Sequence, residues 1–175
     1  MDGEKMKEWF ISDSHFGHGN IIGYENRPFR DSDHMTKELI KRWNSKVGKQ
    51  DIVFHMGDLT FLPKAQTIAI LKALRGRIVL IKGNHDTHSN KWYRDVGVHE
   101  VIEWPIIIHR FLILSHEPMY LSENTPYRNI HGHTHSKNYI SKKFFNASVE
   151  AINYTPVDWE HIAKYIDIGD IETHD

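Results

Sequence analysis

The sequence predicts an α/β fold, and three observations support this. In the first half, short apolar runs alternate with segments of helical periodicity, in the order strand, helix, strand, helix, strand. That order is typical of a parallel sheet with crossover helices. The second half has further short apolar runs with few helical segments between them. The length of 175 residues suits one domain with a sizeable core. We therefore expect a single domain over residues 1–175, with 167–175 as a mobile tail.

The elements of the first half follow from their apolar patterns. Three buried runs predict strands over residues 9–11, 51–56 and 77–82. A near-3.6 spacing of apolar residues predicts a helix that is capped by Asp33 and continues to Val47. A second helix is expected over residues 64–74. It should bury Ala65, Ile68 and Leu71, and Gly76 should stop it.

The second half predicts shorter elements. Strands are expected over residues 98–104, 106–109, 111–115, 128–130 and 144–147. A last helix should begin at Thr155 or Asp158 and continue to Ile166. Four tryptophans are expected in the core rather than as substrate platforms: Trp43, Trp92, Trp104 and Trp159.

Composition excludes several classes of function. Lys and Arg total 22 against 23 Asp and Glu, a formal net charge of −1, which argues against binding to long nucleic acid. The absence of cysteine excludes disulfides and thiolate zinc sites. No stretch approaches the roughly 20 apolar residues of a membrane span, and the N-terminus is too charged for a signal peptide. A cytoplasmic protein is the expectation, and the oligomeric state stays open.

The chain contains 14 histidines, and several follow the predicted strands directly. Five times, an apolar run delivers a carboxylate, amide or imidazole just past its C-terminal end. Because sites in α/β sheets lie at the carboxyl ends of strands, these groups are expected to meet at one edge. In chain order they are Asp13-Ser14-His15, Gly57-Asp58, Gly83-Asn84-His85-Asp86, His116 and Gly132-His133-Thr134-His135.

These residue types suit a pair of metal ions. Oxygen and nitrogen donors from Asp, Asn and His favour ions such as Mn, Fe, Zn or Ni. Two metals about 3.5–4 Å apart can clamp the attacking and leaving oxygens of a phosphoryl displacement. Each motif alone is also explained by a surface pair or a turn. Coincidence is a poor explanation for all five motifs in this order, each after an apolar run.

At these residues the sequence resembles the calcineurin-like metallophosphoesterase superfamily. The resemblance implies a four-layer α/β/β/α sandwich, in which two mixed β-sheets are flanked by helices and a dinuclear metal site lies on one edge. Residues 16–22 and 26–29 are similar to a small prokaryotic or phage subgroup.

The resemblance also implies roles for single residues. Asp13, His15 and His135 look like ligands of a first metal. Asn84, His116 and His133 look like ligands of a second, and Asp58 looks like the carboxylate that bridges both. A metal-bridging hydroxide is then the nucleophile. His85 resembles the general acid, with Asp86 orienting it. The two ions are expected to be divalent transition metals. Manganese is favoured, and Fe, Zn, Ni or Mg are alternatives.

Four further residues could contribute to the site, and two of them, His18 and Arg27, have two interpretations each. His18 could touch a phosphate or a leaving group, or could be a surface histidine. Arg27 could bind phosphate oxygens in a bidentate way, or could anchor its loop through backbone carbonyls. His55 and His131 lie inside strand runs and could support the metal ligands without touching the ions.

The expected function is metal-dependent hydrolysis of a phosphomonoester or phosphodiester in a small molecule or nucleotide. Two alternatives stay open. One is a nuclease or nucleotide-pyrophosphate hydrolase. The other is a non-catalytic scaffold with the same fold, which the complete set of predicted ligands disfavours.

Overall fold

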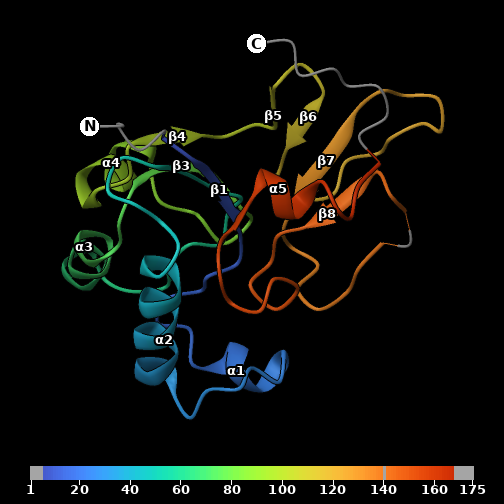
Figure 1. Ribbon diagram of the computed structural model, residues 1–175. Coiled ribbons are helices and arrows are strands. Elements are labelled where there is room, and N and C mark those ends of the chain that lie inside the picture. Colours follow the sequence, from blue (N-terminus) through green and yellow to red (C-terminus); the bar gives the residue numbers. More distant parts are fainter. Residues whose placement is uncertain (1–5, 140, 168–175) are drawn as a thin grey trace, which may run out of the picture.

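The computed structural model describes residues 6–139 and 141–167. Its strands form two sheets. In Figure 1 the blue-to-green N-terminal half lies on one side and the orange-to-red C-terminal half on the other. None of the helices in the described ranges has the length and apolar character needed to cross a membrane.

The first sheet has five strands in the order β4-β3-β2-β1-β9. Strands β1 to β4 run parallel, and only β9 is antiparallel to its neighbour β1. The parallel part confirms the strand–helix alternation expected from the sequence. The strands are β1 Glu8–Ile11, β2 Ile52–His55, β3 Arg77–Ile81, β4 Glu100–Ile102 and β9 Val157–Asp158.

The second sheet has four strands in the order β5-β6-β7-β8. Strand β5 is antiparallel to β6, and β6, β7 and β8 are parallel. Both sheets are therefore mixed, as expected. The strands are β5 Ile106–Ile108, β6 Leu112–Leu114, β7 Arg128–His131 and β8 Phe144–Asn146.

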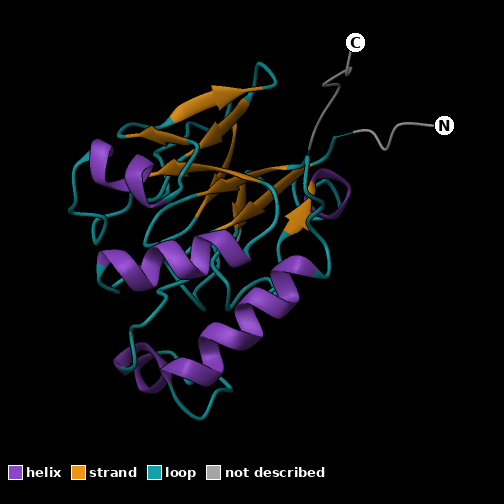
Figure 2. Cartoon of the chain, turned by 90° about the vertical axis from the view of Figure 1, so that its left-hand side faces the viewer, coloured by secondary structure: helices purple, strands orange, loops and turns teal. Residues whose placement is uncertain are grey.

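Helices flank the two sheets, and Figure 2 shows them along the outside of the strands. Trp43 of α2 is 1% exposed and stacks near His55 of β2, so this helix packs on the first sheet. His161 of α5 contacts the ring of Phe145 in β8, on the second sheet. The α/β/β/α class is thus confirmed. The helices are α1 Asn20–Tyr24, α2 Ser32–Asn44, α3 Lys64–Ala73, α4 Asn90–Val96 and α5 Trp159–Ile162.

The two sheets are joined through the residues that follow β1 and β8. Ser12 and Ser148 form an isolated parallel bridge, and both are fully buried. Ser12 N–H donates to the Ala147 carbonyl at 2.8 Å, and Val149 N–H donates to the Ser12 carbonyl at 3.1 Å. Carboxyl ends of strands from both sheets are thereby brought to the same place. 

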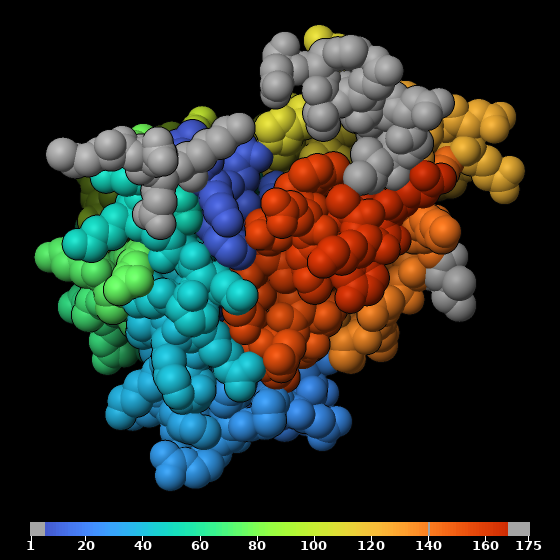
Figure 3. All heavy atoms as spheres, in the orientation of Figure 1, coloured from blue at the N-terminus to red at the C-terminus, as the bar shows by residue number. Residues whose placement is uncertain are grey.

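The C-terminal segment also packs against α2. The Arg42 guanidinium donates to the Asn153 carbonyl at 3.0 Å and lies over the Tyr154 ring. On the face shown in Figure 3, cyan atoms of the α2 region meet the orange-red atoms of this segment. The first and last thirds of the chain therefore share one surface.

Several details differ from the expectations. The cap of α2 is Asp31, whose side chain accepts from His34 N–H, and Asp33 lies in the first turn. Ala65 is exposed and Ile68 is only partly buried, because α3 turns Thr67 and Ile70 inward together with Leu71, which was expected. Trp104 is 75% exposed and is not a core residue.

The short helix α4 and the two-residue strand β9 were not expected. Helix α4 has recognisable local signals, since the Ser89 side chain accepts from Trp92 N–H and Gly97 ends it at φ 117°. The expected tail lies outside the described residues except for Asp167, whose N–H donates to the Lys142 carbonyl at 2.9 Å.

Candidate metal centre

The structure brings the seven predicted metal ligands together at the carboxyl ends of the strands. Asp13 and His15 follow β1, Asp58 follows β2, and Asn84 follows β3. The other three ligands come from the second sheet, His116 after β6 and His133 and His135 after β7. Ligand atoms of Asp13, His15 and His135 lie within 4.8 Å of one another, and so do those of Asp13, Asp58 and His116.

The backbone at these positions is unusual. Five of the seven residues adopt left-handed conformations, with φ between 48° and 67°: Asp13, His15, Asp58, His133 and His135. Such a conformation costs a non-glycine residue roughly 1–2 kcal/mol. It persists only where the surrounding structure enforces it, and it is typical of functional sites.

Two glycines let the loops after β2 and β3 touch. Gly57 has φ 91°, and a Cβ there would lie 2.5 Å from the Gly83 nitrogen and 2.6 Å from His116 Nδ1. A Cβ on Gly83 would lie 2.3 Å from Asp58 Oδ1. Larger residues at either position would push Asp58 and His116 apart.

Asp13, His15 and His135 form the first group. His15 Nε2 lies 3.8 Å from Asp13 Oδ1, and His135 Nε2 lies 3.9 Å from the same oxygen. Asp13 Oδ1 and His15 Nε2 are buried without a hydrogen-bond partner among the described residues. Buried polar atoms are rarely left unpaired. A cation among these three atoms would satisfy them, so the residues present fit a metal ion.

The second carboxylate oxygen of Asp13 is already engaged. Asp13 Oδ2 accepts from His133 N–H and from the Ser148 hydroxyl, each at 2.9 Å. Burial alone would raise the pKa of this carboxyl, but contact with His15 and the nearby His116 and His135 hold its pKa well below the usual range. Asp13 is therefore an anion whose other oxygen, Oδ1, faces His15 and His135.

Asp58 lies between the first group and a second one. Its Oδ1 accepts from His85 N–H at 3.0 Å. Its Oδ2 lies 3.4 Å from His15 Nε2 and 3.7 Å from His116 Nε2. One oxygen atom thus faces an imidazole on each side, which is the arrangement that a bridging carboxylate requires.

Asn84, His116 and His133 form the second group. Asn84 Oδ1 lies 2.8 Å from His116 Nε2 and 3.1 Å from His133 Nδ1. His116 Nδ1–H donates to the Met56 carbonyl at 2.7 Å, which leaves Nε2 as the lone-pair nitrogen in a neutral ring. Ligand atoms that bind one ion through bonds of roughly 2.0–2.2 Å lie about 3 Å from one another. The separations between these three side chains therefore fit one ion.

Glu150 belongs to the candidate site through its contact with His135, and the sequence analysis missed it. His135 Nδ1–H donates to its Oε1 at 3.1 Å, which directs His135 Nε2 toward Asp13. Its pKa stays low despite burial because His135 and Arg27 are in contact with it. Glu150 and Ser148 are polar residues just past β8, the same signal that identified the other five motifs.

Arg27 does not face a substrate. It is 3% exposed, and its guanidinium donates to Glu150 and to the carbonyls of Asp13 and Ser14. The terminal nitrogen Nη2 lies 2.7 Å from Glu150 Oε1. Every guanidinium nitrogen is engaged, so the structure favours the loop-anchoring alternative over the phosphate contact.

The expectation that Asp86 orients the His85 ring is wrong. Both Asp86 oxygens are taken by other donors, namely Asp58 N–H at 2.7 Å, Gly83 N–H at 2.9 Å, Leu59 N–H at 3.2 Å and the Tyr93 hydroxyl at 3.1 Å. Asp86 therefore ties the loops after β2 and β3 together. It positions Asp58 and does not act on the imidazole.

His85 and His18 both lie beside the His15 ring. The His85 side chain is exposed and makes no hydrogen bond among the described residues, while its ring centroid lies 5.8 Å from that of His15. His18 is partly buried, and its Nδ1 lies 3.2 Å from His15 Nδ1. That contact leaves His15 Nε2 directed at the carboxylates.

His55 and His131 are buried behind the loops. His55 Nε2 bonds the Ser14 hydroxyl at 2.8 Å, and burial lowers its pKa to about 3, so the ring is neutral. His131 Nδ1–H donates to the Gly132 carbonyl at 2.8 Å. Neither ring contacts a predicted ligand directly, but each fixes a residue next to one.

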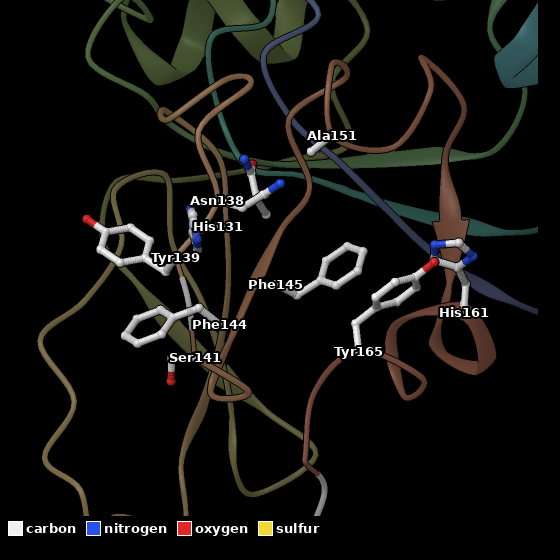
Figure 4. A pocket seen from close by; sticks show the side chains of 10 residues that line it. His131, Asn138, Tyr139, Ser141, Phe144, Phe145, Ala151, His161 and Tyr165 are labelled. Atoms are coloured by element: carbon white, nitrogen blue, oxygen red, sulfur yellow. The ribbon is translucent and has the colours of Figure 1, made fainter.

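A hollow lies beside β8 and His131. It has a volume of about 290 Å³ and is bordered by His131, by residues of β8 and by α5. Figure 4 shows aromatic side chains of this hollow, among them Tyr139, Phe144 and Phe145. Asn146 also lines it and donates to the His135 carbonyl at 2.7 Å, so this wall supports the loop of the first group.

Comparison with known proteins gives one family model and several relatives. The sequence matches the calcineurin-like phosphoesterase superfamily domain over residues 6–153. An uncharacterized protein of Methanocaldococcus jannaschii is 38% identical over 174 residues, covering 94% of each chain. The gene 66 protein of Mycobacterium phage D29 is 30% identical, covering 74% of this chain and 78% of the phage protein.

The solved structures include a protein of unknown function from Aquifex aeolicus. It superposes with a TM-score of 0.73 at 28% identity, covering 93% of this chain and all of that one (100%). The domain match covers strands β1 to β8 and all seven predicted ligands. The chain therefore belongs to the calcineurin-like phosphoesterase superfamily.

Proposed function

We propose that this protein hydrolyses phosphoester bonds in a small molecule or nucleotide and depends on two divalent transition-metal ions. The observation that carries the proposal is the position of Asp58 Oδ2, 3.4 Å from His15 Nε2 and 3.7 Å from His116 Nε2. A shared carboxylate between two groups of O and N donors is the arrangement of a two-metal phosphoesterase.

The seven predicted ligands are assigned to two ions. Asp13, His15 and His135 would hold one ion, Asn84, His116 and His133 the other, and Asp58 both. When bound, the ions supply a water of lowered pKa as the nucleophile and positive charge for the phosphoryl oxygens. We favour manganese because the donors are imidazole, carboxylate and amide oxygen.

His85 is proposed as the general acid. Its backbone N–H is fixed by Asp58 Oδ1 at 3.0 Å, while its imidazole is exposed beside His15. The ring is thus held near the centre without serving as a ligand. It can donate a proton to the leaving oxygen as the P–O bond breaks.

The test is a panel of phosphomonoesters, phosphodiesters, nucleotides and nucleic acids, assayed with metal-free protein and after adding Mn²⁺, Fe²⁺, Zn²⁺, Ni²⁺ or Mg²⁺. We expect hydrolysis only with metal, and loss of activity on chelation. Full activity in the metal-free protein would contradict the mechanism. Metal binding without cleavage of any phosphoester would favour the scaffold alternative.

A further inference from the structure

Three aromatic side chains beside the candidate metal centre have no part in the proposed hydrolysis. They are His18 in the loop after β1, Tyr24 at the end of α1, and Phe61 in the segment after β2, and together we call them the aromatic wall. The Phe61 ring centroid lies 4.2 Å from that of His18, and the His18 centroid lies 6.3 Å from that of Tyr24. The three rings are therefore contiguous.

Phe61 packs against three histidine rings at the edge of the site, those of His15, His18 and His85. Its centroid lies 5.2 Å from His15 and 4.2 Å from His18, with interplanar angles of 16° and 26°. The His15 and His18 centroids are only 5.3 Å apart. Rings stacked on opposite faces would be much farther from each other, so both histidines lie on the same side of Phe61.

The wall is exposed although it is largely apolar. Phe61 is 43% exposed and Tyr24 is 71% exposed. Scattered exposed aromatics need no explanation, but contiguous ones at the edge of a candidate active site indicate a surface for a ligand. A flat ring stacked there would remove apolar area from water on both partners.

The backbone that carries the wall is fixed. Phe61 N–H donates to the Phe16 carbonyl at 2.9 Å, and Phe16 N–H donates to the Leu59 carbonyl at 3.0 Å. His18 N–H donates to the His15 carbonyl at 3.0 Å. The wall is therefore held in register with the predicted ligands His15 and Asp58, as a preorganised binding surface requires.

We propose that the aromatic wall binds a planar aromatic group of the phosphoester substrate, a nucleobase or an aryl ring, while the phosphate lies at the metal centre. This assignment rests on the proposed function for the position of the phosphate. Phe61 is then a specificity-determining residue. Stacking of one base is expected to tighten binding about 5- to 150-fold.

The experiment measures dissociation constants by calorimetry on Mn²⁺-loaded protein, with two matched pairs of ligands. Thymidine 5′-phosphate carries a base at C1′ where deoxyribose 5-phosphate carries a hydroxyl, and phenyl phosphate carries an aromatic ring where methyl phosphate carries a methyl group. We expect the aromatic member of at least one pair to bind 5-fold tighter or more. A preference in the first pair assigns a nucleobase, and a preference in the second pair alone assigns an aryl group.

Phe61→Leu is the decisive variant, because it keeps an apolar side chain over His15 but removes the flat ring. It should retain its metal content and lose the aromatic preference, whereas Phe61→Tyr should keep both. Tyr165→Ala is the control, since Tyr165 is 60% exposed and lines the hollow beside β8 instead of the aromatic wall. This variant should leave the preference unchanged.

The outcomes separate this inference from the proposed function. If the two ligands of each pair bind equally well, the aromatic wall does not bind an aromatic group, even if hydrolysis is observed. A preference that survives Phe61→Leu overturns the role of Phe61. A preference lost in Phe61→Leu without any hydrolysis supports the wall and rejects the proposed activity. If no phosphate compound binds the metal-loaded protein, both proposals fail.

Discussion

The two ligand groups differ in how firmly the protein holds them. In the first group, Asp13 and His15 are 0% and 1% exposed, and partners behind the first group fix Asp13 and His135. In the second group Asn84 and His133 are exposed, and His116 is anchored through the single Met56 carbonyl. The first group is thus built by the fold, while the second depends more on its ion.

Charge distinguishes the groups in the same direction. The first has the carboxylate of Asp13 in addition to its share of Asp58, whereas the second has only Asp58 beside neutral amide and imidazole donors. Coulomb attraction to a divalent ion grows with the number of adjacent carboxylates. We therefore expect the first ion to bind more tightly than the second.

The largest effect is expected from Asp58→Ala, because Asp58 faces both groups. Loss of this carboxylate should weaken both ions and lower kcat by at least about 10³-fold, several kcal/mol of transition-state stabilisation. His116→Ala should weaken chiefly the second ion. Metal analysis of the two variants after dialysis checks this, and equal losses of one ion in each would reject a bridging carboxylate.

His85→Ala should keep both ions and lose rate. General-acid catalysis contributes roughly 10²–10⁴-fold and matters most for poor leaving groups. The rate on an alkyl phosphoester should therefore fall steeply, while a nitrophenyl ester should be much less affected. Rates on both esters and metal content are measured on the same sample. Equal rate losses would remove the general-acid role, and loss of an ion would make His85 a ligand.

Glu150→Ala should selectively damage the first group. It removes the acceptor that orients His135, which should weaken the first ion about 10- to 100-fold. It also leaves the guanidinium of Arg27 buried without its carboxylate, at a cost of roughly 3–5 kcal/mol in the free energy of unfolding.

Glu38→Ala is the matched control for Glu150. Glu38 contacts the exposed Lys41 and the partly exposed Arg42 on α2, so its loss should change stability by less than about 0.5 kcal/mol. Chemical denaturation and metal titration compare the two variants. If Glu150→Ala matched the control in both measurements, the support for His135 would be disproved.

A pH dependence of stability is expected from His55, which holds Ser14 between Asp13 and His15. Burial lowers the pKa of His55 to about 3, against 6.5 in an unfolded chain. Below pH 6.5 the unfolded chain takes up a proton that the folded ring does not. Stability should therefore fall with decreasing pH down to about 3, by up to about 1.4 kcal/mol per pH unit.

His55→Gln isolates this contribution, since glutamine does not titrate. The free energy of unfolding of metal-free protein is measured with denaturant at several pH values between 4.5 and 7. It should change more steeply with pH in the wild type than in the variant. Parallel slopes would show that His55 does not remain neutral in the folded protein.

The first group was easier to predict from the sequence than its supports. The apolar runs before Asp13 and Asp58 predicted strands β1 and β2, and with them the place of both carboxylates. Glu150 and Ser148 follow the three-residue strand β8. Their role depends on pairing between the two sheets, which no local pattern encodes.

Arg27 and Asp86 show why side-chain direction could not be predicted. Both residue types suit chemistry at a phosphate site, and both lie next to the predicted motifs. The structure instead turns each inward, where Arg27 meets the Asp13 and Ser14 carbonyls and Asp86 meets backbone N–H groups. The spacing of motifs in the sequence predicts where the backbone of a residue lies. The packing of the loops determines the direction of its charged side chain.

The most direct test of the whole account is a Mn²⁺ titration of metal-free protein in which metal occupancy and phosphoester hydrolysis are followed together. We predict two ions per chain, a tighter one that binds without full activity and a weaker one whose binding brings the activity. Full activity at one ion per chain, or two ions bound with no phosphoester cleaved, would contradict the account.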